Sequence, residues 1–224
     1  MRQRKNILCV LMTTAVALFA GAGQAQNKVI VAPTGEYAKI DVRLAQDTIK
    51  VLSSGSAQEK DNAVALVLAH PENYVPPVFY AMSAVLFDLG KKDDAAFWFY
   101  AGQLRARFDA NRCLDISARQ AVGVLNQTYG TPINQYALKD MTKLEALIPR
   151  VVEWDKATPH NYDARWINLH GMGAVISGLS PASSPAAPVA FTAPKDTWDA
   201  IAEKTRADYL SGFQTFVAQS KTRK

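Results

Sequence analysis

Apolar residues recur every three to four positions over most of the chain, the spacing that gives an α-helix one apolar face. Glycine, proline and short polar runs separate these apolar segments. The pattern predicts helices over residues 37–52, 56–69, 78–89, 93–108, 112–128, 131–148 and 164–170. The short β-branched run at 28–33 instead predicts an extended arm or an edge strand.

Residues typical of helix ends mark several of these boundaries. Ser56, with Glu59 three positions later, is typical of the capping box that begins a helix. Pro76 suits a first helical turn, where no backbone amide is needed, and Gly90 suits the left-handed residue that follows a helix. Pro132, directly after Thr131, predicts that a new helix begins there.

Two further residues qualify the helical pattern. Pro149 predicts a kink or an end to the helix that precedes it, because proline removes a backbone hydrogen bond. Asp163 directly precedes the short segment 164–170 and suits its N-cap.

The segment 93–108 carries four consecutive aromatic residues, from Phe97 to Tyr100. Consecutive positions on a helix point in different directions, so these aromatics predict a helix that is buried on most sides. We expect this helix to lie at the centre of the core.

The C-terminal part of the chain divides into a linker and a helix. Residues 180–195 are rich in proline, alanine and serine, which is typical of a linker. Asp196 then suits the cap of a final helix within 196–224. The apolar positions of this helix are Trp198, Ile201, Ala202, Tyr209, Phe213, Phe216 and Val217. Such a stripe predicts docking on the body of the chain, on a partner, or on a second copy as an oligomerisation arm.

Residues 1–25 have the three parts of a secretory signal peptide. Arg2, Arg4 and Lys5 precede an apolar stretch, and small residues follow up to Ala25, where we expect cleavage. The apolar stretch is shorter than the ~20 residues of a membrane span, and no later span is expected. The sequence therefore predicts a periplasmic or secreted protein with a helical domain at 26–179.

The signal segment also accounts for most of the basic character of the chain. The 224 residues are 49% hydrophobic and 20% charged, a globular composition with a formal charge of +5. Without the three basic residues of the signal, 22 basic residues face 20 acidic ones, a net charge of +2. A near-neutral exported protein is a poor partner for nucleic acid.

Cys113 is the only cysteine outside the signal segment, so no internal disulfide is expected. A lone cysteine can be a nucleophile or a thiol that links a partner. The more common role, which we expect here, is that of a small buried hydrophobe.

The segment Phe79–Gly90, followed by Lys91–Ala101, resembles one helix pair of the tetratricopeptide or Sel-like superfamily, over about residues 77–108. The positions that carry the resemblance are small residues at Ser83 or Ala84, a glycine at Gly90, alanine at Ala95 or Ala96, and an aromatic at Phe99 or Tyr100. A fainter second unit runs from Gly123 to Ala137, and no third is visible. The resemblance implies stacked helical hairpins that bind a peptide or protein on a concave face.

Three residues between 160 and 170 form the candidate catalytic group. His160, Asp163 and His170 suit a hydrolase that uses a base, an orienting carboxylate and a further histidine. Their spacing matches no metal-binding pattern, and the chain carries no nucleophile or phosphate-loop motif. We therefore predict no metal and no cofactor, and keep an envelope hydrolase as the alternative function.

The candidate partner-binding residues are Arg105, Arg112, Arg165 and Trp166, because arginine and tryptophan are enriched where proteins bind one another. A local ion-pair network is the alternative role for the arginines. Taken together, the sequence predicts an exported all-α protein of stacked helical hairpins that acts without catalysis. It is expected to bind a protein or peptide in the cell envelope, in one version as an immunity-type inhibitor of an effector that acts in the periplasm.

Overall fold

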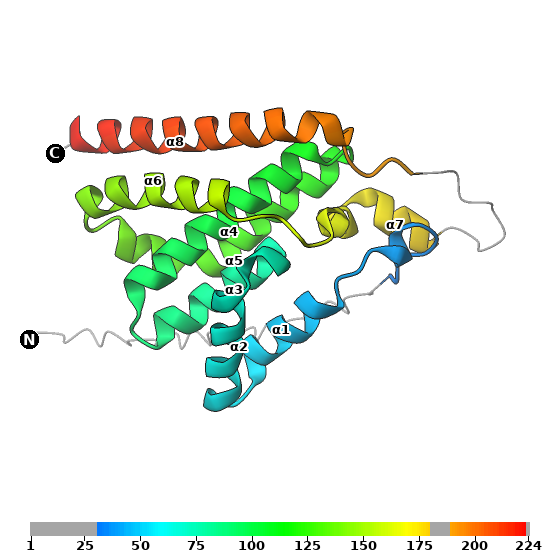
Figure 1. The fold of residues 1–224 in the computed structure, drawn as a ribbon, viewed down its shortest axis with the longest axis horizontal. Coiled ribbons are helices and arrows are strands. Elements are labelled where there is room, and N and C mark those ends of the chain that lie inside the picture. Colours follow the sequence, from blue (N-terminus) through cyan, green and yellow to red (C-terminus); the bar gives the residue numbers. More distant parts are fainter. Residues whose placement is uncertain (1–30, 180–188, 223–224) are drawn as a thin grey trace, which may run out of the picture. The chain divides into compact units, whose positions relative to one another are not determined.

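The computed structural model describes residues 31–179 and 189–222, which form an all-α fold and confirm the predicted fold class (Figure 1). The α-helices are α1 (Arg43–Ser54), α2 (Ala57–Ala69), α3 (Pro76–Asp88), α4 (Lys92–Arg112), α5 (Gln120–Ala137), α6 (Met141–Ala157), α7 (Met172–Leu179) and α8 (Trp198–Thr222). Short 3-10 turns connect them at η1 (Tyr37–Lys39), η2 (Pro71–Asn73), η3 (Ile116–Arg119), η4 (Ala164–His170) and η5 (Lys195–Thr197).

Several predicted segments lie partly or wholly outside the described residues. The signal peptide at 1–25 and most of the linker at 180–195 fall there. Of the predicted arm or strand at 28–33, residues 31–33 are described and form no strand. Within the described chain, no helix is long and apolar enough to span a membrane.

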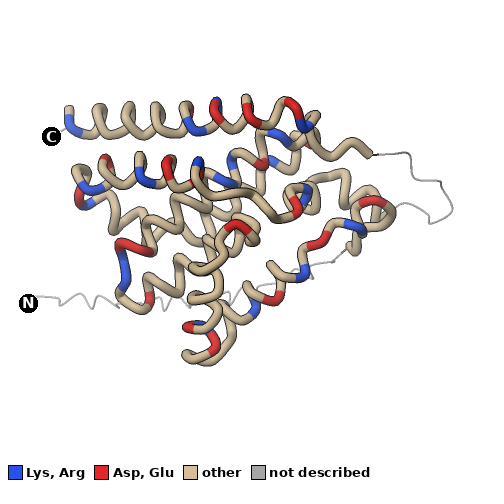
Figure 2. Tube along the Cα trace, in the orientation of Figure 1, with Lys and Arg blue, Asp and Glu red and all other residues tan. Residues whose placement is uncertain are grey.

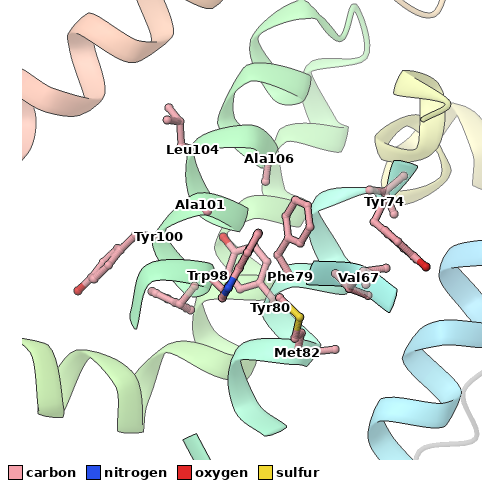
Figure 3. Close-up of a cluster of buried hydrophobic side chains, with 14 of the residues drawn as sticks. Val67, Tyr74, Phe79, Tyr80, Met82, Trp98, Tyr100, Ala101, Leu104 and Ala106 are labelled. Atoms are coloured by element: carbon pink, nitrogen blue, oxygen red, sulfur yellow. The ribbon is translucent and has the colours of Figure 1, made fainter. Parts of the chain in front are cut away.

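Helix α4 is the centre of the fold, as its aromatic run predicts. It packs against α3, α5, α6 and α8, and it is buried on nearly all of its faces. Figure 3 shows rings from α3 and α4 gathered between the two helices. The ring of Phe79 lies 5.3 Å from that of Trp98, and Tyr80 lies 5.3 Å from Phe99 in an edge-to-face arrangement. Large aromatic surfaces removed from water supply much of the stabilisation in such a core.

Helices α3 and α4 are the pair that the sequence predicts between residues 77 and 108. A glycine lets them approach closely, since a Cβ at Gly102 would lie 3.1 Å from the Cβ of Phe79. Gly90 adopts the left-handed conformation with φ of 76° and ends the pair's first helix as predicted. A regular tetratricopeptide-like stacking of such pairs stays a prediction.

The predicted caps of two helices are confirmed. The Ser56 amide donates to the Glu59 carboxylate at 2.7 Å, and the Glu59 amide donates to the Ser56 hydroxyl at 3.3 Å, which completes the capping box of α2. Asp163 caps η4 by accepting a hydrogen bond from the Arg165 amide at 3.0 Å.

The predicted start of a new helix at Pro132 is wrong, because α5 continues through it. Of the kink or end predicted at Pro149, the end is wrong, because α6 continues to Ala157. Both prolines lie on exposed positions, where a carbonyl that loses its amide partner can bind water instead. The break lies between the two helices at residues 138–140. Asp140 caps α6 there by accepting a hydrogen bond from the Lys143 amide at 3.0 Å.

The predicted helix at 112–128 is also divided differently. The chain leaves α4 at Cys113, forms η3 and resumes as α5 at Gln120. The cause is tertiary: Cys113 forms an isolated antiparallel bridge with Thr192, and the Leu114 amide donates to the Phe191 carbonyl at 3.1 Å. The extended segment before α8 therefore holds this part of the chain out of a helix.

Helix α8 docks on α4 and α6 of the same chain, and Figure 1 shows it running beside α6. Its buried side chains include Ala202, Thr205, Tyr209 and Val217. Asp196 lies inside η5, which leads directly into α8, rather than at a helix cap. Of the three predicted docking modes for this helix, the structure shows the one on the body of the chain.

Candidate functional site

One hollow that the fold leaves open is a groove along α4, between α5 and α8. Both helices pack on α4, but they do not pack extensively on each other. The space between them has a volume of about 410 Å³. It is lined by Tyr100, Gln103 and Arg107 of α4, Asn134 and Leu138 at α5, and Asp208, Tyr209, Gly212, Phe213 and Phe216 of α8. We call it the aromatic groove.

Hydrogen bonds and ring contacts hold the floor of the aromatic groove. The Tyr100 hydroxyl donates to Asn134 Oδ1 at 2.9 Å, and the Tyr209 hydroxyl donates to Gln103 Oε1 at 2.8 Å. Burial raises the pKa of Tyr100 to about 12 and that of Tyr209 well above its ordinary value, so both hydroxyls stay protonated donors. Phe213 lies against both rings, at 5.3 Å from Tyr100 and 5.0 Å from Tyr209. The floor is thus fixed before anything binds.

The α8 wall of the groove follows from the spacing of its residues. Tyr209, Phe213 and Phe216 are four and three residues apart and share one face of the helix. Gly212 also lines the groove, and a Cβ added there would meet nothing within 4 Å. Phe216 remains 42% exposed. Figure 2 shows that the second half of α8 carries no charge until Lys221 near its end.

The rim of the groove carries one cation without an acidic partner. Arg107 is exposed and lies 5.6 Å from the centre of the Tyr209 ring, and it forms no ion pair with any described residue. Asp208, also at the rim, already pairs with Lys204 at 2.8 Å. The groove is therefore aromatic inside and has a free positive charge at its edge.

Three of the four predicted partner-binding residues belong to the interior of the described chain, which corrects their expected place at a surface. Arg105 is 0% exposed and donates to Asp155 at 3.0 Å and to the Thr158 carbonyl at 2.7 Å. A guanidinium is stable there because a carboxylate distant in sequence neutralises it. The alternative role considered for these arginines, an ion-pair network, is the one that the structure gives Arg105.

The other two buried candidates meet at Asp109. Arg112 forms a buried ion pair with Asp109, and the Trp166 indole donates to the same carboxylate at 2.6 Å. The hydroxyl of Tyr162 donates to it as well, at 3.1 Å. Arg165, the fourth candidate, lies at the surface and pairs with Asp163 at 2.7 Å.

The structure does not bring the three candidate catalytic residues together. His160 Nε2 lies 3.1 Å from Asp155, and its ring stacks on Tyr162 at 5.7 Å. Asp163 is occupied by its cap and by Arg165, and partial burial beside Trp166 lowers the pKa of His170. No interaction among the described residues joins any two of the three.

Cys113 is buried as expected, and its thiol donates to Asn168 Oδ1 at 3.2 Å. Burial raises the pKa of this thiol, which disfavours the reactive thiolate. No group of three or more metal-ligating side chains occurs in the part of the chain that the structure describes.

Sequence reasoning identified one wall of the aromatic groove and missed the rest. The apolar stripe of α8 was predicted, but not its meeting with Tyr100 and Asn134 on other helices. The usable signal is Gly212, because a glycine costs stability inside a helix and so indicates that space is needed at that position of the apolar stripe.

Comparison with known proteins assigns no family to the chain. No family model matches it, and no solved structure matches it. A curated protein of Haemophilus influenzae, described as uncharacterised, is 27% identical over 140 residues, which are 62% of this chain and 49% of that protein. The chain thus spans about half the length of this curated relative, and the similarity carries no assigned activity.

Proposed function

We propose that this is an exported, non-catalytic helical protein that binds a protein or peptide partner in the cell envelope, through the aromatic groove. The observation that carries the proposal is the open face of α4 between α5 and α8, lined by rings and edged by Arg107. Export rests on the signal-like segment 1–25 of the sequence.

The shape and chemistry of the groove favour a short amphipathic helix of the partner. The groove follows α4 from Tyr100 to Arg107, which at a rise of ~1.5 Å per residue is about two helical turns. An apolar side chain of the partner would fill the space over Gly212, against Phe213 and Phe216. An acidic side chain of the partner would pair with Arg107. Helix-in-groove binding uses such apolar anchors at helical spacing, and tyrosine and arginine are enriched among residues that dominate binding.

An immunity-type inhibitor of an effector that acts in the periplasm is one specific version of this proposal. In that version the partner is the effector, and the complex is tight and one-to-one. The envelope hydrolase remains an alternative prediction, but no contact among His160, Asp163 and His170 favours it.

The test compares two variants, Gly212→Leu and Gly123→Leu. Both glycines lie inside helices at positions where an added Cβ meets nothing within 4 Å, but only Gly212 lines the groove. Each variant should fold, since leucine is favoured over glycine in a helix by nearly 1 kcal/mol. Leucine at Gly212 occupies the space of the partner's apolar anchor.

The wild-type protein and both variants would be used to capture partners from the envelope of the cells that produce the protein. We expect one stoichiometric protein to be retained by the wild type and by Gly123→Leu, and to be lost with Gly212→Leu. Titration of that purified partner should show at least about a tenfold weaker affinity for Gly212→Leu. Equal binding by the two variants, or no stoichiometric partner for the wild type, would contradict the proposal.

A further inference from the structure

A second hollow, separate from the aromatic groove, lies where the C-terminal end of α4, the end of α6 and the start of α8 meet. Its volume is about 300 Å³, and its wall includes Phe108, Arg112, Asp155, Lys156, His160, Trp198 and Arg206. This volume is at the lower end of the range for sites that bind small molecules.

The interior beside this hollow holds more positive than negative charge. Three guanidinium groups, those of Arg105, Arg112 and Arg206, share two carboxylates, Asp109 and Asp155. None of these five side chains is more than 14% exposed. Asp155 serves two of the arginines, at 3.0 Å and 2.8 Å. A buried cation is costly unless an anion and hydrogen bonds compensate it, so this excess favours an additional anion.

Arg112 is held in a way that suits anion binding. Its guanidinium lies between two aromatic rings, 4.4 Å from the centre of Phe108 and 4.3 Å from the centre of Trp198. Asp109 occupies one of its donors, and its Nε, which is buried, has no hydrogen-bond partner among the described residues. A stacked guanidinium has its plane fixed and presents its donors at the edge, where oxyanions bind.

With the exposed groups included, four cations face four carboxylates, so the excess of positive charge is confined to the buried side chains. Arg206 donates from Nε to Asp155 at 2.8 Å and from Nη1 to Glu203 at 2.9 Å, but Glu203 is an exposed side chain in solvent. Lys156 and Asp199, both exposed, line the hollow with opposite charges and offset each other. His160 adds a ring nitrogen, Nδ1, that is buried and has no partner among the described residues.

We propose that this hollow binds a small organic anion. Its carboxylate or phosphate oxygens accept hydrogen bonds from Arg112 and Arg206, and its apolar body lies against Trp198 and Phe108. The two arginines supply the fork-shaped donors that suit planar or tetrahedral oxyanions, and the aromatic wall selects an organic ligand over an inorganic one. This inference goes beyond the proposed function and does not rest on it, because the two sites share no lining residue.

The test titrates the full chain, after removal of the signal segment, with benzoate, phenyl phosphate and benzamide at constant low ionic strength. Benzamide keeps the shape of benzoate and lacks its charge. We expect both anions, or one of them, to bind by calorimetry and to raise the unfolding temperature, while benzamide does neither. Binding of benzoate alone identifies a carboxylate ligand, and binding of phenyl phosphate alone identifies a phosphate ligand. Failure of both anions, or equal binding of benzamide, would overturn the proposal.

Variants locate the binding in the hollow. Arg206→Gln should weaken the binding of the anion about tenfold or more. Lys156→Gln should weaken it only about two- to fivefold, because Lys156 is exposed. Lys50→Gln, an exposed change on α1, should leave binding unchanged. Gly212→Leu should leave it unchanged too, which separates this site from the aromatic groove. If Arg206→Gln does not fold, as judged by circular dichroism, Lys156→Gln decides the location. If neither variant weakens the binding of the anion, the proposal that the anion binds in this hollow is refuted.

Discussion

Replacement of Asp155 by asparagine should destabilise the protein far more than the same replacement at Asp93. Asp155 is 3% exposed and accepts hydrogen bonds from Arg105 at 3.0 Å and Arg206 at 2.8 Å. Asparagine keeps the shape of the side chain but removes its charge. Arg105, which is 0% exposed, would then be buried without a carboxylate to neutralise its charge.

The expected magnitude follows from the burial of the pair. Removal of one partner from a buried ion pair costs about 3–5 kcal/mol, because an uncompensated charge remains in the interior. Asp93 pairs with Lys143 at 2.6 Å, but these side chains are 58% and 52% exposed. Such a surface pair is worth about 0–1 kcal/mol. The difference of roughly 3 kcal/mol is a large share of the ~5–15 kcal/mol by which domains are stable.

Urea unfolding followed by circular dichroism measures both variants on one scale, with the midpoint and the slope reported separately. The double variant Arg105→Met with Asp155→Leu should recover part of the stability that Asp155→Asn loses, because it removes the buried charge of Arg105 together with its partner, while Arg206 keeps Glu203. If the free energies of unfolding of Asp155→Asn and Asp93→Asn differ by less than about 1 kcal/mol, buried Arg105 does not depend on Asp155.

Three further predictions concern the pH dependence of stability, a helix cap and a buried thiol. Burial raises the pKa of Asp155, but the hydrogen bond to His160 and the positive charges around the carboxylate lower it by more. The pKa therefore lies below its ordinary value; the neighbouring groups are His160, Arg105 and Arg206. The contribution of ionised Asp155 to the free energy of unfolding is therefore complete above the ordinary pKa of an aspartate and is lost as the pH falls through the lowered pKa. The free energy of unfolding should accordingly fall less steeply with decreasing pH in Asp155→Asn than in the wild type. Ser56→Ala should cost about 1 kcal/mol through loss of the capping box of α2, which urea unfolding would show as a lower midpoint at an unchanged slope. The buried Cys113 thiol should react with an aromatic disulfide reagent only as fast as the protein opens; rapid labelling under native conditions would show that it is accessible.

The helical segments and their caps could be predicted because they depend on neighbours in the sequence. Ser56 and Glu59 lie one turn apart, and a capping box needs nothing else. The aromatic run Phe97–Tyr100 predicts a helix buried on most sides for an equally local reason, since four consecutive positions cover the whole circumference. The continuation of α5 through Pro132 could not be predicted, because the tertiary structure overrode a local preference of a few kcal/mol.

The roles of the arginines show where local information ends. The sequence offers Arg105 and Arg112 as partner-binding residues, with a local ion-pair network as the alternative, and no neighbouring residue decides between the two. Whether such a side chain is exposed or buried depends on a countercharge, and the one for Arg105 lies 50 residues away on α6. The partner of Arg112 is three residues away, but its burial depends on Trp198 of α8, which stacks on the guanidinium.

The sequence by itself determined the all-α class, the positions of most helices and the central place of α4, because helical periodicity and capping act over one or two turns. Only the tertiary structure decided that α8 docks on its own chain, and that α5 and α8 leave a groove along α4. It also brought three arginines to two carboxylates beside a second hollow. These features arise from contacts between residues tens of positions apart, and such contacts depend on how the helices pack around one another.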